Sequence, residues 1–257
     1  MRLESKVAIV TGAGQGIGLA YARRFLVEGA CVVVADINKE RGEAALGTLG
    51  SPDQTRFVHT DITNEASAEA CVAETVAAFG TVHVLVNNAA LYHDIDNANS
   101  SYEYLRHVFD VNLHGAWVMT RAAAPVMTAQ RWGRVINQSS VAAYLYDAPV
   151  RAEFEEVKAF AYGQTKWGVV GLTKFLAGQL GQYNVLVNCI APGVTMTEAT
   201  QKVIPGKVQD HLVSSSAMKR ALQPEDLTGV AVFFASDDSA MVTGQVLCVD
   251  GGLCMPA

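Results

Sequence analysis

Seven short apolar runs, spread along the whole chain, restrict the folds open to this sequence more than any other feature. Most are rich in valine or isoleucine, and several are continuously apolar, which is the pattern of a parallel strand covered on both faces. The predicted strands are Val7–Val10, Cys31–Ala35, Arg56–His59, Val82–Val86, Arg134–Asn137, Val185–Cys189 and Gln245–Val249.

Longer segments between these runs have apolar residues three or four apart, as in Ile17–Glu28, Ser67–Phe79 and Trp167–Leu180. Such spacing is typical of helices. Strands alternating with helices predict an α/β fold, a doubly wound parallel sheet of about seven strands with helices on both faces. The alternation continues to both ends without a linker, so residues 1–257 are expected to form one domain.

The first predicted strand leads into a glycine-rich turn, Gly12-Ala13-Gly14-Gln15-Gly16-Ile17-Gly18, and a helix follows at once. Glycines let the backbone turn tightly and come close to a pyrophosphate, which sits at the positive N-terminus of the helix. Glycines alone could form an ordinary turn. Their strand–turn–helix context predicts a Rossmann-like dinucleotide site, and residues 1–257 as a dinucleotide-binding domain.

The second predicted strand leads to Asp36, 18 residues after Gly18. A carboxylate there can accept hydrogen bonds from both adenosine ribose hydroxyls and would repel a 2′-phosphate. NADP would need a nearby cation, and neither Gln15 nor Ile37 is one. We therefore predict NAD(H) as the cofactor; the alternative is a solvated aspartate at the end of a strand.

Further motifs follow in order: Asn87-Asn88-Ala89-Ala90, Asn112 in Asp110-Val-Asn-Leu, Ser139-Ser140 after a strand, and Tyr162-Gly-Gln-Thr-Lys166. Together with the glycine turn, this set closely resembles the short-chain dehydrogenase/reductase family, in the branch whose members have about the length of this chain. The resemblance covers essentially the whole chain, because Pro192-Gly193 and Asp250-Gly251-Gly252 also match the family pattern.

The resemblance implies a hydride-transferring enzyme with a catalytic tetrad of Asn112, Ser140, Tyr162 and Lys166. It also implies a small alcohol or ketone as substrate, no metal, and a homotetramer or homodimer. The expected cofactor-binding residues are Gly12, Gln15, Gly16, Ile17, Gly18, Asp36, Ile37, Asp61, Ile62, Asn88, Ala89, Tyr162, Lys166, Pro192, Gly193, Thr195 and Thr197.

Tyr162 and Lys166 are one helical turn apart and share a face. The pKa of a free tyrosine is about 10. A lysine ammonium beside it favours the phenolate and lowers that pKa. Tyr162 could then take the alcohol proton as hydride leaves for the nicotinamide, while Ser140 holds the substrate oxygen. Lys166 would also bind the nicotinamide ribose, and Asn112 would anchor a water. Without the other motifs, the tyrosine and lysine could be an ordinary amphipathic helix edge.

Two positions depart from the family pattern. Ala90 stands where the family often has glycine, which is tolerable if its φ is negative. Ser140 and Tyr162 are 22 residues apart, more than is usual in the family, yet no serine or threonine lies between Val141 and Ala161. Ser140 is therefore retained, with Ser139 as the second choice.

Two segments should border the substrate. The extra segment, about 144–160, joins the end of a strand to the catalytic helix, so it either contacts the substrate or is a surface insertion. The stretch 197–218 resembles the substrate-binding loop of the family, which often closes over bound ligand.

Composition and charge argue against several classes of protein. The net charge is −6 and no lysine or arginine run is present, so nucleic acid is not an expected partner. The N-terminus does not resemble a signal peptide, and no apolar stretch reaches the roughly 18 residues of a membrane span. The five scattered cysteines lack metal-ligand or redox spacing, which favours buried, reduced thiols in a cytoplasmic protein.

Three functions remain open. The favoured one is an NAD-dependent dehydrogenase of a secondary alcohol, and the alternative is an NADH-dependent reductase of a carbonyl such as a 3-oxoacyl group. Basic residues for an acyl carrier or coenzyme A are few: Lys202, Lys207, Lys219 and Arg220. A non-catalytic dinucleotide sensor should have lost Tyr162 or Lys166, and both are present.

Overall fold

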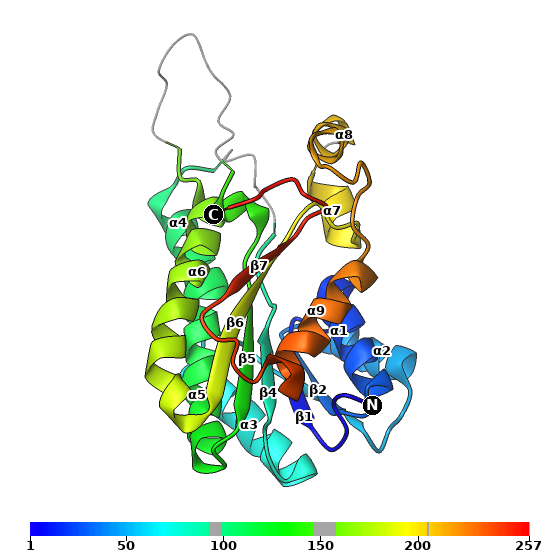
Figure 1. The fold of residues 1–257 in the computed structure, drawn as a ribbon, viewed down its shortest axis with the longest axis vertical. Helices are drawn as coiled ribbons and strands as arrows, with labels where there is room; N and C mark the ends of the chain where they lie inside the picture. Colours follow the sequence, from blue (N-terminus) through cyan, green and yellow to red (C-terminus); the bar gives the residue numbers. More distant parts are fainter. Residues whose placement is uncertain (93–98, 146–157, 205, 257) are drawn as a thin grey trace.

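The computed structural model describes residues 1–92, 99–145, 158–204 and 206–256 (Figure 1). Within them, seven parallel strands form one sheet in the order β3-β2-β1-β4-β5-β6-β7. The strands are β1 (Val7–Thr11), β2 (Cys31–Asp36), β3 (Thr55–His59), β4 (Val84–Asn87), β5 (Gly133–Gln138), β6 (Val185–Pro192) and β7 (Val246–Val249). All seven predicted strands are present with ends shifted by a few residues, and the predicted fold class is confirmed.

The central strands explain why the sequence reads as continuous apolar runs. Every residue of β1, β4, β5 and β6 is buried. A strand covered on both faces is apolar along most of its length instead of alternating apolar with polar side chains, and the buried polar residues of β5, such as Asn137, are hydrogen-bonded. The edge strand β7 is only partly covered, and its Leu247 is exposed.

Helices cover both faces of the sheet (Figure 1). On one face lie α1 (Gly16–Val27), α2 (Lys39–Leu49) and α9 (Pro224–Ala235), which contribute Phe25, Ala45 and Leu227 to one apolar core. On the other face lie α3 (Glu65–Phe79), α5 (Gly115–Ala129) and α6 (Ala161–Leu180), which contribute Val72, Met119 and Leu176 to a second core. The three predicted helices correspond to α1, α3 and α6.

Three consecutive helical segments form one continuous helix that ends on the second face of the sheet. It consists of α4 (Tyr102–Phe109), the π-helical turn η1 (Asp110–His114) and α5, and the backbone stays helical at both junctions. A π-turn holds an extra residue and is frequent at functional sites. Here it contains the buried Asn112.

The remaining described elements lie mostly at the carboxyl edge of the sheet. Part of the predicted substrate loop is helical, as α7 (Glu198–Val203) and α8 (Gly206–Ser215). The single-turn helices are η2 (Val141–Ala143), η3 (Gly181–Tyr183) and η4 (Asp237–Ser239). Most of the predicted insertion, residues 146–157, lies outside the described residues.

All five cysteines are free, but only Cys71 and Cys189 are buried, so the expectation of buried thiols is wrong for the other three. In the described part of the chain, the helices are too short or too polar to cross a membrane.

Candidate active site

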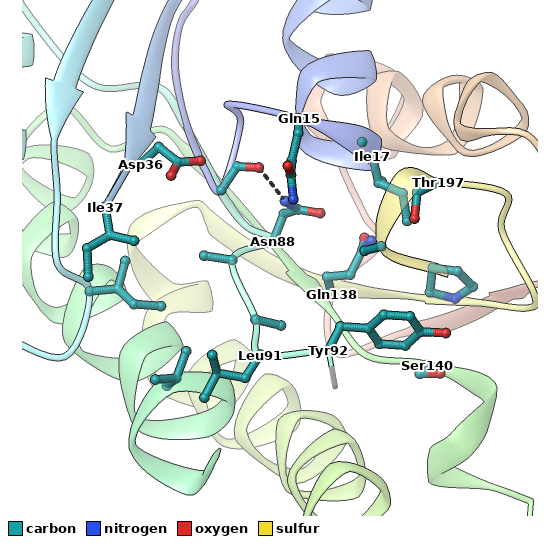
Figure 2. A pocket seen from close by; sticks show the side chains of 18 of the residues that line it. Gln15, Ile17, Asp36, Ile37, Asn88, Leu91, Tyr92, Gln138, Ser140 and Thr197 are labelled. Atoms are coloured by element: carbon teal, nitrogen blue, oxygen red, sulfur yellow. Dashed lines mark hydrogen bonds between the residues drawn. The ribbon is translucent and has the colours of Figure 1, made fainter. Parts of the chain in front are cut away.

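A cavity of about 420 Å³ opens at the carboxyl edge of the sheet, and Figure 2 shows side chains that line it. The cavity lies where β1 and β4 are neighbours while the chain runs from β1 to β2 on one side and from β4 to β5 on the other. Such a switch point is where open α/β sheets bind ligands. Every predicted cofactor residue except Gly18 lines this cavity.

The glycine turn is shaped by contacts that a side chain would destroy. Gly12 has φ +64°, and a Cβ there would lie 2.8 Å from the Cα of Ala89. Gly16 has φ +57°, a conformation that favours glycine. A Cβ on Gly18 would lie 2.4 Å from the oxygen of Gly12 and 2.6 Å from Nδ2 of Asn88. Gly18 does not line the cavity; its lack of a side chain lets α1 pack closely against the glycine turn.

Asn88 stabilises the glycine turn through hydrogen bonds to its backbone. Its Nδ2 donates to the backbone oxygens of Thr11, at 2.9 Å, and Gly12, at 3.3 Å, and its backbone N–H donates to Oγ1 of Thr11. These bonds join the ends of β1 and β4. Asn88 fixes the backbone that a pyrophosphate would contact. The neighbouring Ala90 has no positive φ, so the methyl group fits as the sequence argument required.

Asp36 lies at the far end of the cavity from Ser140 (Figure 2). Its carboxylate is buried and accepts hydrogen bonds from the backbone N–H of Gly14, at 3.0 Å, and of Asn38, at 2.9 Å. Nη2 of Arg41 lies 3.6 Å from the same carboxylate, and Arg41 also lines the cavity.

Sequence reasoning missed Arg41, because it considered only Gln15 and Ile37 as neighbours of Asp36. The overlooked signal is the early start of α2, which Asn38 caps by accepting a hydrogen bond from the N–H of Arg41. A helix that starts so soon after the strand brings its first turn back to the strand end. The assumption that no cation lies near Asp36 is therefore wrong.

Three of the four predicted catalytic residues meet at the other end of the cavity. Tyr162 and Lys166 lie on α6, with Nζ of Lys166 5.4 Å from the centre of the Tyr162 ring. Lys166 is 3% exposed, and its Nζ donates to the backbone oxygen of Gln138 at 3.0 Å. Ser140 follows β5, and its hydroxyl lies close enough to Tyr162 to lower the pKa of that tyrosine. Ser139 instead donates to the backbone oxygen of Lys166 at 2.7 Å.

Burial governs the ionisation of both groups on α6. It raises the pKa of Tyr162; the nearby Tyr92 raises this pKa further, and the Ser140 hydroxyl lowers it. Burial lowers the pKa of Lys166 to about 8. Lys166 was expected to lower the pKa of Tyr162, but in the protein without cofactor the desolvation of the ring dominates. A phenolate here needs further positive charge close to Tyr162.

Asn112, the fourth predicted catalytic residue, does not line the cavity. Its Oδ1 accepts from the backbone N–H of Leu91 at 2.7 Å, and its Nδ2 donates to the oxygen of the same residue at 3.1 Å. Asn112 thus ties the π-turn to the segment that follows β4. Its role as an anchor for water stays a prediction.

Tyr92 is the second residue that sequence reasoning missed. Its ring meets the Tyr162 ring edge-on, with centres 5.3 Å apart and planes at 68°. Burial raises the pKa of Tyr92, and the nearby hydroxyl of Thr200 on α7 lowers it. Tyr92 belongs to no motif, and only its place just after Asn87-Asn88-Ala89-Ala90 at the end of β4 could have indicated it.

The other predicted cofactor residues border the cavity from separate loops. Asp61 accepts hydrogen bonds from the N–H and the hydroxyl of Thr63. Thr195 donates to the oxygen of Gly193, and Thr197 caps α7. Among the described residues, no group of histidine, cysteine, aspartate or glutamate side chains could hold a metal ion.

A dinucleotide fits this donor set. Positive-φ glycines open a cradle at the N-terminus of α1, a carboxylate stands at one end of the cavity, and a tyrosine and a lysine stand at the other.

Comparison with known proteins places the chain in a family of oxidoreductases. A family model described as enoyl-(acyl carrier protein) reductase matches residues 12–254. The chain belongs to the short-chain dehydrogenase/reductase family. Family members similar to it include an uncharacterized oxidoreductase of Mycobacterium tuberculosis, 42% identical over 97% of both chains. The 3-oxoacyl-[acyl-carrier-protein] reductase of Thermotoga maritima is 36% identical and covers 98% of this chain and 99% of its own.

A solved structure of the same family supports the fold in detail. The 3-ketoacyl-(acyl-carrier-protein) reductase of Brucella melitensis, complexed with NADH, has a TM-score of 0.86 and 32% identity. The match covers 98% of this chain and 100% of that one. The protein is thus an oxidoreductase of the short-chain dehydrogenase/reductase family.

Proposed function

We propose that this short-chain dehydrogenase/reductase uses NAD(H) and interconverts a secondary alcohol and a ketone, with Tyr162 as the general acid and base. One observation carries the proposal: a single cavity is bordered by Asp36, by the glycine turn, and by Tyr162 and Lys166. A cofactor site and a proton-transfer site that share one cavity are what hydride transfer requires.

Each end of the cavity has a separate task. Asp36 would bind the adenosine ribose, the N-terminus of α1 the pyrophosphate, and Lys166 the nicotinamide ribose. When bound, the nicotinamide accepts or supplies the hydride. Because burial raises the pKa of Tyr162, the positive charge of Lys166 and of the oxidised cofactor would offset that rise.

The protein side chains handle the substrate oxygen and its proton. The Ser140 hydroxyl would donate a hydrogen bond to the substrate oxygen. The phenolic oxygen of Tyr162 would then accept the alcohol proton during oxidation and return it to the carbonyl oxygen during reduction. Lys166, with a pKa of about 8, keeps most of its positive charge at neutral pH.

Preference for NAD(H) rests on the buried carboxylate of Asp36, which would repel a 2′-phosphate. The Brucella relative complexed with NADH supports the same choice. A cytoplasmic homotetramer or homodimer belongs to the proposal. Exposed aromatic side chains on the outer helices, Trp117 on α5 and Trp167 and Phe175 on α6, are consistent with a subunit interface.

The test is absorbance at 340 nm with NAD⁺ and NADP⁺ over a panel of secondary alcohols, diols and hydroxyacyl thioesters, with Tyr162→Phe as the control. We expect turnover with NAD⁺ that is lost in the variant. A clear preference for NADP⁺ would refute the argument from Asp36. Tight NADH binding with no turnover on any substrate would favour the sensor function.

A second candidate is reduction of a 3-oxoacyl thioester. The reductases of Thermotoga and Brucella favour it by their names. The basic residues near the substrate loop favour it less, because Lys219 donates to the oxygen of Ser214 and Arg220 pairs with Asp226. Oxidation of NADH with acetoacetyl-coenzyme A, faster than with free ketones, would select this candidate.

A further inference from the structure

The arginine that the sequence argument overlooked occupies a defined position at the adenosine end of the cavity. Arg41 lies in the first turn of α2, and its side chain is 42% exposed. It borders the cavity together with Asp36 and Ile37. Its only described ion pair is with Asp36, at 3.6 Å, which is longer than a charge-assisted hydrogen bond. Part of the guanidinium can therefore still meet a ligand.

Three donors converge on the Asp36 carboxylate. The N–H of Gly14 binds Oδ2, the N–H of Asn38 binds Oδ1, and the guanidinium of Arg41 lies beside Oδ1. Two backbone N–H groups and an arginine are also the donors that phosphate-binding sites use. These donors form an anion-binding site, and the carboxylate of Asp36 itself occupies it.

We propose that Arg41 is a specificity-determining residue that weakens discrimination against the 2′-phosphate of NADP(H). The inference rests on the proposed dinucleotide function. In the wild-type chain, the carboxylate of Asp36 repels the 2′-phosphate, while Arg41 screens that repulsion and donates to the phosphate. When Asp36 is neutralised, Arg41 and the freed backbone N–H groups bind the phosphate directly.

The test measures dissociation constants for NADH and NADPH from the quenching of protein fluorescence, which needs no substrate. The variants are Arg41→Ala, Asp36→Ser and the double variant. Lys39→Ala is the matched control, because Lys39 carries the same charge in the same helical turn, is exposed, and does not line the cavity.

Loss of one charge-assisted contact changes affinity by about ten- to a hundred-fold. Arg41→Ala should therefore weaken NADPH binding by roughly tenfold or more and NADH binding by about threefold at most, whereas Lys39→Ala should change both about equally. Asp36→Ser should weaken NADH and strengthen NADPH, and the gain should vanish in the double variant. If wild-type NADPH binding is too weak to measure, the Asp36→Ser background carries the comparison.

Equal losses of NADH and NADPH in Arg41→Ala, or an NADPH gain that survives in the double variant, would overturn the role of Arg41 and leave the proposed function standing. Failure of the wild-type chain to bind either dinucleotide would overturn both. Thermal unfolding checks that each variant is folded. Asp36→Asn replaces Asp36→Ser if that variant unfolds, because it removes the charge and keeps the shape.

Discussion

Replacing Gly18 by alanine tests the contact that sets the glycine turn. The added Cβ would lie 2.4 Å from the oxygen of Gly12 and 2.6 Å from Nδ2 of Asn88. Non-bonded carbon atoms are most stable about 3.5–4.0 Å apart. Neither neighbour is the free end of a flexible chain, because one is backbone and the other is held by hydrogen bonds to Thr11 and Gly12. Either α1 or the amide of Asn88 must move.

The cost follows from these contacts. Overpacking costs about 1–3 kcal/mol, and each hydrogen bond lost from Asn88 adds about 1 kcal/mol. Alanine regains at most about 1 kcal/mol through its higher helix propensity. The net loss is about 2 kcal/mol, which lowers Tm by roughly 4–8 °C in a chain of this size. Because the displaced atoms form the predicted pyrophosphate cradle, NADH affinity should also fall by roughly tenfold or more.

The matched control is Gly47→Ala in α2. Gly47 is exposed, and a Cβ there meets nothing within 4 Å. The same substitution should therefore raise stability by about 0.5–1 kcal/mol and leave NADH affinity unchanged. Circular dichroism melts and NADH fluorescence titrations measure both effects. A Gly18→Ala variant as stable as Gly47→Ala, with wild-type NADH affinity, would refute the reasoning.

Three further predictions concern the catalytic end of the cavity. Tyr162→Phe should lower kcat by about 10²–10⁴-fold while the NADH dissociation constant stays within about threefold; a comparable kcat would remove Tyr162 as the acid and base. Tyr92→Ala loses the edge-on ring contact, worth about 0.5–1.5 kcal/mol, and should lower kcat by up to about tenfold, whereas Tyr92→Phe keeps the ring and should lower it less. The pKa of Lys166 is about 8 when folded against 10.5 for the free side chain, so the unfolded chain binds more protons between these values and stability rises with pH across that window. The stability of wild type relative to Lys166→Met, from urea unfolding, should therefore increase by about 2 kcal/mol from pH 7 to pH 9.5, and an unchanged difference would contradict the desolvation of Lys166.

Local patterns predicted the parts of the site that depend on chain geometry alone. The glycine turn follows β1 directly, and Tyr162 and Lys166 share one turn of α6, so neighbours in sequence are neighbours in space. Short apolar runs, several of them continuous, predicted all seven strands, because the central strands of a parallel sheet are covered on both faces.

Contacts between residues of separate elements could not be predicted from local patterns. Arg41 reaches Asp36 because α2 begins at Lys39, only three residues after β2 ends at Asp36. Tyr92, which follows β4, meets Tyr162 on α6 through the packing of separate elements. The balance of pKa effects at Tyr162 was also out of reach, since desolvation depends on how much protein surrounds the ring. Tertiary packing decides all three.

The strand order of the sheet has a consequence during synthesis of the chain. β1 can pair with β2 soon after both leave the ribosome, but its other neighbour is β4, with Ala8 opposite Val84. Translation at about 5–20 residues per second separates the synthesis of β1 and β4 by about 4–15 s. For that time β1, whose first four residues are apolar, presents an open edge, which is a template for pairing with another nascent chain. The pairing of β1 with β4 at the centre of the finished sheet thus leaves the growing polypeptide with an edge that a chaperone could protect.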